Sequence, residues 1–317
     1  MAAPGTVFMF SGQGSQYFQM GRELYDTHAR FRSTVRRLDA IAHAMLGRSP
    51  IEEAHRGDKS QNFDRLRYTH PAIFIIEHAL AECLVADDIV PDMTLGASLG
   101  TFAAASIAGF IDPEQALHTI VAQADAVESS CERGGMTAIV DDPALFDAPF
   151  LREHTTLSAI NFERHFVVSA APAVLDSVEA ELRARGVVHQ RLAVQYAFHS
   201  PWIDPARDDV EALLGTLPVA DGRIPMACCA TADVHRKAFD PGHLWNVVRK
   251  PIRFSDAIAR LEREGAWRYI DVGPSGTLAT FAKYAMPSGS ASTTASILTP
   301  FGRDMKNYEA LTGRPVV

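Results

Sequence analysis

Gly96-Ala97-Ser98-Leu99-Gly100 is the stretch of sequence that decides the fold, because it places a serine between two glycines after a strand-like run. Residues 89–95 before it are apolar, and residues 101–110 after it are alanine-rich and typical of a closely packed helix. A sharp strand-to-helix turn lifts the serine hydroxyl above the sheet, and small glycines permit the crowded backbone. The pattern predicts Ser98 as a nucleophile and the Leu99 N–H as an oxyanion donor. A tight turn with an ordinary capping serine fits the same residues.

A second loop, near the N-terminus, is also rich in glycine. The apolar run Val7-Phe8-Met9-Phe10 is typical of a buried strand and leads into Ser11-Gly12-Gln13-Gly14-Ser15-Gln16, ahead of a helical pattern that starts near Tyr17. Such a loop offers free backbone N–H donors. A nucleotide-phosphate cradle is disfavoured, because the loop has neither a Gly-Lys-Ser/Thr ending nor a Gly-x-Gly-x-x-Gly spacing. A plain turn is the remaining alternative.

A candidate general base lies much later in the chain. His199 follows the apolar run at residues 191–194 and precedes a turn fixed by Pro201. A serine is a poor nucleophile at neutral pH and needs a neighbouring imidazole to accept its proton and return it to the leaving group. The chain has 12 histidines, and most histidines in proteins are surface or hydrogen-bonded core residues. His199 is therefore a candidate by position alone.

Four segments together resemble, in their order, the signature of malonyl-CoA:acyl carrier protein transacylases. This family includes the acyltransferase domains of fatty acid and polyketide synthases. The resemblance spans residues 7 to about 282 and rests on the segments 10–16, 96–100, 197–201 and 271–276. It implies a dyad of Ser98 and His199 that forms an acyl-serine ester from a thioester, with the backbone N–H groups of Gln13 and Leu99 as the oxyanion hole. It also implies that a backbone carbonyl orients the imidazole; the sequence does not identify which one.

One departure from the family concerns the acyl group. Members that use malonyl units carry an arginine 25 positions after the nucleophile, and this chain has Gln123 there. An amide cannot replace the charge-assisted pair that a guanidinium makes with a carboxylate, a loss of roughly 2–5 kcal/mol in a partly desolvated site. Arg133 could reach in, but a surface charge beside Gly134-Gly135 fits it better.

Other positions near the proposed cleft give mixed signals. Ala97 replaces the histidine that usually precedes the nucleophile, and Tyr196 replaces another histidine, whereas Phe198 keeps the residue of malonyl-selective members. Asn161 matches an asparagine that lines the cleft in relatives, although Phe162 follows it where glycine is usual. The resemblance thus implies Gln123, Asn161, Tyr196 and Phe198 as substrate-binding residues.

Family members with glutamine in place of the arginine are free-standing proteins of polyketide assembly lines. The resemblance implies that they hydrolyse stalled acyl groups from carrier proteins, so we expect an editing hydrolase. The alternative is a trans-acting transacylase that loads malonyl or another acyl group from CoA or carrier protein. The chain begins shortly before the first motif and ends soon after the last, which favours a free-standing enzyme. A generic α/β-hydrolase esterase would need a later histidine than His199, and an inactive carrier-protein adaptor would not need Ser98 and His199.

The expected fold is α/β with two parts. A large α/β-hydrolase-like subdomain with a parallel sheet takes residues 1–130 and 199–317, and a small inserted ferredoxin-like subdomain takes residues 131–198. The family resemblance implies that the active site lies between these two subdomains. Expected strands of the large part are 7–10, 93–95, 224–230 and 269–272, with helices at 72–85, 113–129 and 205–214. The small part is expected to have strands at 136–140, 157–161, 166–170 and 187–193 and a helix at 173–185. Residues 287–294 are expected to be a flexible link and residues 301–311 a closing helix.

Composition indicates a cytoplasmic enzyme. Of the 317 residues 47% are apolar, enough for a large core, and no signal peptide or 18-residue apolar run is evident, so we expect no membrane partner. The net charge of −8 without a long basic run argues against nucleic acid. The four cysteines have neither metal-ligand nor disulfide spacing, so we expect reduced thiols, no metal and no cofactor apart from the acyl-CoA or phosphopantetheinyl carrier substrate.

Carrier proteins are acidic, and two basic clusters could bind one: Arg249-Lys250 with Arg253, or Arg183, Arg185 and Arg191.

Overall fold

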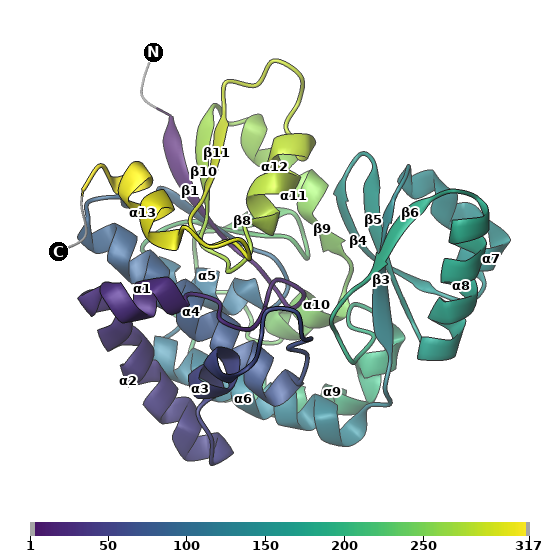
Figure 1. Ribbon diagram of the computed structural model, residues 1–317, viewed down its shortest axis with the longest axis horizontal. Helices are drawn as coiled ribbons and strands as arrows, with labels where there is room; N and C mark the ends of the chain where they lie inside the picture. Colours follow the sequence, from purple (N-terminus) through teal and green to yellow (C-terminus); the bar gives the residue numbers. More distant parts are fainter. Residues whose placement is uncertain (1–3, 315–317) are drawn as a thin grey trace.

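The computed structural model describes residues 4–314 and contains two β-sheets flanked by helices (Figure 1). The larger sheet has six strands in the order β11-β10-β1-β2-β7-β8. Five of them pair in parallel, as the sequence predicts, and only the edge strand β8 is antiparallel. The strands are β1 (Gly5–Phe10), β2 (Met93–Gly96), β7 (Met226–Cys228), β8 (Asp233–His235), β10 (Trp267–Asp271) and β11 (Thr293–Ser296).

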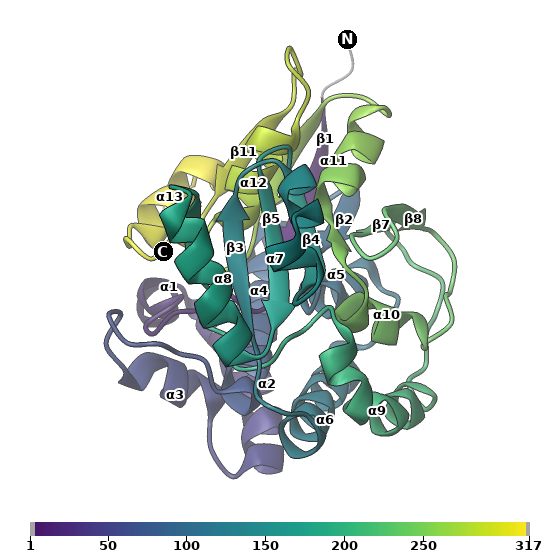
Figure 2. The ribbon, with the colours of Figure 1, turned by 90° about the vertical axis from the view of Figure 1, so that its right-hand side faces the viewer.

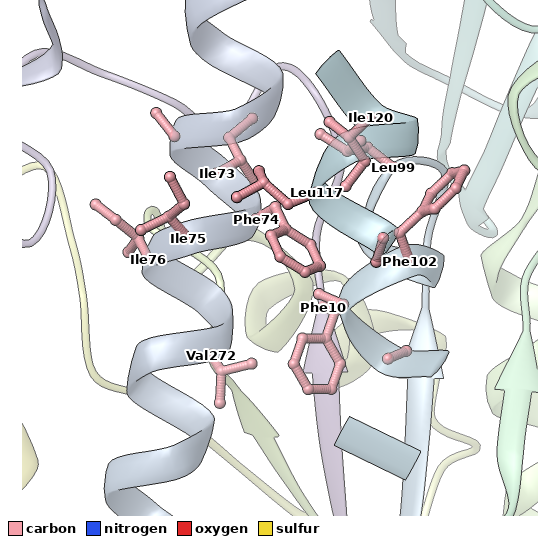
Figure 3. Close-up of a cluster of buried hydrophobic side chains, with 14 of the residues drawn as sticks. Phe10, Ile73, Phe74, Ile75, Ile76, Leu99, Phe102, Leu117, Ile120 and Val272 are labelled. Carbon is pink, nitrogen blue, oxygen red and sulfur yellow. The ribbon is translucent and has the colours of Figure 1, made fainter. Parts of the chain in front are cut away.

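Helices bury both faces of this sheet, which explains why β1 has four consecutive buried apolar residues, Val7-Phe8-Met9-Phe10. Phe8 and Phe10 of β1 point to one face, where they join the large cluster that includes Phe74 and Phe102 (Figure 3). Val7 and Met9 of β1 point to the opposite face and pack with residues of α11 and α12. The helices of this part are α1 (Arg22–Thr27), α2 (Ala29–Leu46), α3 (Pro50–Arg56), α4 (Leu66–Ala86), α5 (Gly100–Ala108), α6 (Pro113–Ser130), η2 (Pro201–Ala206), α9 (Arg207–Leu214), α10 (His243–Arg249), α11 (Phe254–Glu262), α12 (Thr277–Ala285) and α13 (Asp304–Thr312).

The second sheet has the order β6-β3-β5-β4-β9. Its first four strands are antiparallel and follow the chain as β-α-β-β-α-β, the ferredoxin-like arrangement. Helices α7 and α8 cover one face of this sheet (Figure 2). Ile139, Phe166 and Leu175 form a separate core there. The elements are β3 (Gly135–Val140), η1 (Pro143–Asp147), α7 (Pro149–Arg152), β4 (Thr156–Phe162), β5 (His165–Ala170), α8 (Pro172–Ala184), β6 (Val188–Arg191) and β9 (Ile252–Arg253).

The α/β fold class predicted from the sequence is confirmed, but several details differ. The second sheet gains β9, which comes from outside residues 131–198 and pairs in parallel with β4. The expected strand 224–230 is limited to the three residues of β7. Part of the expected flexible link forms β11 on β10, because Thr293–Ser296 can complete an open sheet edge. The first helix starts at Arg22 rather than near Tyr17, because Gln19 and Gly21 have positive φ.

Helix α4 corrects one expectation about apolar runs. By length and composition alone it could cross a membrane, although sequence analysis found no such run. In this structure 83% of its apolar window is buried. Its Glu77 lies inside the protein and accepts hydrogen bonds from the backbone N–H and hydroxyl of Ser11. The helix is therefore packed as the central core helix of a globular fold.

Candidate active site

The Gly-x-Ser-x-Gly stretch forms a sharp turn between β2 and α5. Ser98 has φ of 54°, the left-handed region that few non-glycine residues adopt. A Cβ on Gly96 would lie 2.4 Å from Cα of Thr101, and a Cβ on Gly100 would lie 2.1 Å from the carbonyl oxygen of Phe10. Both contacts are with backbone atoms, so neither neighbour can move aside. The two glycines are thus required for the turn that presents Ser98.

His199 lies next to Ser98 although 101 positions separate them in the chain. Its Nε2 is 2.9 Å from Ser98 Oγ, and its Nδ1 is 2.7 Å from the carbonyl oxygen of Lys250. A carbonyl only accepts hydrogen bonds, so Nδ1 carries the proton and Nε2 is free to accept the hydroxyl proton of Ser98. Lys250 therefore supplies the orienting carbonyl that the sequence did not identify. The backbone N–H of His199 also donates to the carbonyl of Val248.

The imidazole of His199 is in the right protonation state to act as a base. The side chain is 2% exposed, and burial lowers its pKa to about 4, although the Lys250 carbonyl acts in the opposite direction. At pH 7 the ring is neutral. It can accept the proton of Ser98 without first losing one to solvent.

The glycine-rich loop after β1 lies against the Ser98 turn. A Cβ on Gly12 would lie 2.8 Å from Cβ of Ser98 and 3.4 Å from the backbone nitrogen of Leu99, so only glycine allows this approach. In the described part of the chain no acceptor is found for the backbone N–H of Gln13 or of Leu99. Gly12, the neighbour of Gln13, approaches Ser98, and Leu99 follows Ser98 in the chain, so these two unused N–H groups stay the predicted oxyanion donors. Ser11 and its partner Glu77 on α4 anchor the loop from behind.

A cleft of about 490 Å³ opens at Ser98 and His199 between the two sheets. Loop residues 11–17 and the Ser98 turn form one wall. The second sheet contributes the other wall, mainly with small and apolar side chains: Met136, Ala138, Ala159 and Val167. Among the described residues, no lysine, arginine, aspartate or glutamate lines this cleft. Its wall is therefore uncharged around the dyad.

Of the four residues expected to bind substrate, two line the cleft. Phe198 lies beside the dyad, and Asn161 faces the cleft with its Nδ2 3.0 Å from Nδ1 of His165. Gln123 and Tyr196 are not among the lining residues. Gln123 on α6 is fully buried, and neither of its amide atoms has a hydrogen-bond partner. Gln123 and Tyr196 are thus buried outside the cleft lining, whereas Ala97, another departure from the family, lines the cleft.

Tyr196 and Arg133 contact each other. The guanidinium of Arg133 lies over the Tyr196 ring, 5.2 Å from its centroid, and also donates to the side-chain oxygen of Gln195. Arg133 does not line the cleft. Arg133 is exposed outside the cleft, which agrees with the sequence-based interpretation of this residue as a surface charge.

Sequence reasoning missed His70 of α4. His70 lines the cleft, is 2% exposed, and its ring packs on Phe198 with centroids 5.6 Å apart. Burial lowers its pKa to about 3, and Nδ1 has no partner. A histidine inside a long apolar helical run is the signal that could have identified it.

The chain belongs to the acyl transferase domain family, which matches residues 7–314, and this confirms the resemblance seen in its four motifs. It is 41% identical over 308 residues to the Bacillus velezensis protein named polyketide biosynthesis acyltransferase homolog BaeD, covering 96% of this chain and 95% of that protein. The Bacillus subtilis homolog PksD has the same identity and coverage. The acyltransferase domain from the second module of the salinomycin polyketide synthase aligns with a TM-score of 0.86 at 27% identity, covering 100% of this chain and 75% of the other.

Proposed function

We propose that this protein hydrolyses acyl thioesters of an acyl carrier protein in polyketide biosynthesis, through an acyl ester on Ser98. The observation that carries the proposal is an uncharged cleft around a preformed Ser98–His199 pair. A carboxylated acyl group would lose water there without gaining a counter-ion, whereas a neutral acyl group would not. The uncharged cleft therefore favours removal of neutral acyl groups over loading of malonyl.

The proposed chemistry has two steps. Ser98 Oγ attacks the thioester carbonyl while Nε2 of His199 takes the hydroxyl proton, and the N–H groups of Gln13 and Leu99 donate to the oxyanion. The carbon–sulfur bond breaks, and His199 returns the proton to the leaving thiolate. In the second step His199 takes a proton from water as the water oxygen attacks the ester carbonyl. The bond between the acyl carbon and Ser98 Oγ then breaks, His199 returns its proton to Ser98 Oγ, and the carboxylic acid leaves. The names of the relatives support a role in polyketide biosynthesis.

The second candidate is a transacylase, which the word acyltransferase in the names of both relatives favours. It would use the same acyl-serine ester and pass the acyl group to a carrier thiol. The dyad geometry is the same for both. Only the acceptor separates the two functions.

The structure limits where a carrier protein could dock. Arg249 pairs with Asp204, Arg253 with Asp256, and Arg185 with Glu181. Arg191 pairs with both Glu179 and Asp176. Neutralised side chains attract an acidic partner weakly, so both predicted basic clusters offer less free charge than their sequence indicates. A carrier partner and a cytoplasmic location stay predictions.

The test separates hydrolysis from transfer. The enzyme is incubated with an acetyl-loaded carrier protein, alone and with an unloaded carrier of different mass, and all species are followed by intact mass spectrometry. We expect free acid and an acyl adduct on Ser98, with little acyl group on the second carrier. Ser98→Ala is the matched control and should give no adduct. Efficient transfer to the second carrier would support the transacylase instead.

A further inference from the structure

Three potential metal-binding side chains meet at the β7–β8 edge of the larger sheet, outside the cleft. Cys228 ends β7, His235 ends β8, and His243 is the first residue of α10. One ligand atom from each lies within 4.8 Å of the others. None of the three lines the cleft. Their arrangement therefore needs an explanation separate from the dyad.

The geometry of the group is close to that of a metal site. Nε2 of His243 lies 3.4 Å from Sγ of Cys228. In a tetrahedral zinc site with the usual bond lengths, a sulfur and a nitrogen ligand are about 3.5 Å apart. This pair already has the required separation. The third ligand atom needs a shift on the order of 1 Å, within the range of a side-chain rotation.

Burial leaves part of this cluster without partners. Cys228 is fully buried, and Nε2 of His235 is buried without a hydrogen-bond partner. The rings of His235 and His243 lie 4.8 Å apart, and a ligand atom of each lies within 4.8 Å of a ligand atom of Cys228. An unpartnered buried nitrogen is costly unless something binds it.

We propose that Cys228, His235 and His243 bind one Zn²⁺ ion, with water in the fourth position. Zinc is bound by thiolate and imidazole ligands in tetrahedral geometry, and this mixed set suits it better than Mg²⁺ or Ca²⁺, which prefer oxygen. Binding breaks the S–H bond of Cys228 and forms a zinc–sulfur bond, so one proton passes to the buffer for each ion bound.

The ion would join the β7–β8 hairpin to α10. The segment that follows this seven-residue helix supplies the Lys250 carbonyl to His199 Nδ1, and the helix itself supplies the Val248 carbonyl to the His199 backbone. Zinc at the start of α10 would therefore fix the element that orients His199. The proposed zinc site does not depend on whether water or a carrier thiol accepts the acyl group from Ser98.

The test uses the full chain, stripped with a chelator and titrated with Zn²⁺ and with Co²⁺ as a spectroscopic probe. We expect one equivalent of either ion to bind, release of one proton per ion, and a thiolate-to-cobalt charge-transfer band in the near ultraviolet. Zn²⁺ should also raise the melting temperature by about 3 °C or more at saturating concentrations. Absence of the charge-transfer band in the wild-type protein would overturn the proposal without any variant.

Variants assign the ligands. Cys228→Ser and His243→Gln should each weaken binding by about a hundredfold or more, since even outer-shell changes cost 10- to 100-fold. Cys229→Ala is the matched control, because Cys229 is the adjacent residue and is equally buried, and His154→Gln controls for exposed histidines. Both controls should bind as the wild type does. Undiminished binding by folded Cys228→Ser protein, or loss in Cys229→Ala alone, would contradict the assignment.

Discussion

Ser98 and His199 both have backbone conformations that are unfavourable for their residue types. Their φ angles are 54° and 58°, and such conformations cost roughly 1–3 kcal/mol each. The turn glycines hold Ser98, and the carbonyls of Val248 and Lys250 hold His199 from two sides. The Oγ–Nε2 separation is therefore set before any substrate binds, which lowers the entropy cost of proton transfer.

The pH dependence of acyl-enzyme formation should report the low pKa of His199. The base must be unprotonated, so kcat/KM for a small neutral acyl thioester should rise through about pH 4 and be level well before pH 6.5, the ordinary histidine value. Because burial lowers the folded-state pKa, the neutral ring also adds stability above pH 6.5 that is lost as the pH falls towards 4. Circular dichroism at each pH separates the two effects. A kinetic midpoint near 6.5 would contradict the assignment.

Gln123 offers a second test at the scale of one residue. Its buried amide has no partner, so Gln123→Leu should raise the free energy of unfolding by about 1 kcal/mol, because an apolar group of similar size removes the unsatisfied dipole. Urea denaturation measures the change. Activity on a neutral acyl thioester should stay within about twofold if the amide does not touch substrate. A large loss of activity in stable protein would restore the substrate-binding role that the sequence predicted.

At the scale of elements, the β2–α5 turn depends on Gly100. Gly100→Ala should lower the free energy of unfolding by about 1–3 kcal/mol or more, because the new Cβ would lie 2.1 Å from the Phe10 carbonyl oxygen and force β1 and α5 apart. Chemical denaturation measures it. The matched control is Gly215→Ala at the end of α9, where the nearest atoms are 3.4 and 3.5 Å away and φ is negative. An equal loss in both variants would exclude steric conflict as the cause.

The sequence predicted some elements better than others. Elements whose own residues determine their structure were predicted, whereas elements that depend on residues elsewhere in the chain were not. Strand β1 has four consecutive buried apolar residues, Val7-Phe8-Met9-Phe10, so its composition alone indicates a strand. Strands β8 and β9 have three and two residues, too few for a composition signal, and β9 forms only because the distant strand β4 is present. In the site, Ser98 and His199 lie in recognisable motifs, whereas any residue can provide the carbonyl that Lys250 provides. Cys228, His235 and His243 have no familiar metal-ligand spacing and meet only after folding.

At the scale of the whole molecule, a short segment connects the two sheets to the dyad. Ile252 and Arg253 pair with β4 of the second sheet, while the backbone N–H of Arg253 donates to the carbonyl of Cys229 beside β7. Lys250, two residues earlier, accepts the hydrogen bond from His199. The position of the second sheet and the orientation of His199 therefore depend on the same stretch of backbone.

The cleft between the sheets should select against carboxylated acyl groups. Its described lining has no charged side chain, and burial keeps His70 neutral by lowering its pKa to about 3. A malonyl carboxylate would therefore lack the counter-ion whose loss costs roughly 2–5 kcal/mol. We expect kcat/KM for acetyl-carrier to exceed that for malonyl-carrier by about 30-fold to several thousandfold. The test measures kcat/KM for the acetyl and malonyl forms of one carrier protein in a stopped assay. Using one carrier protein keeps the docking contribution constant. Equal rates would mean that a cation from outside the described lining reaches the carboxylate, and Arg133→Ala would then show whether Arg133 supplies it.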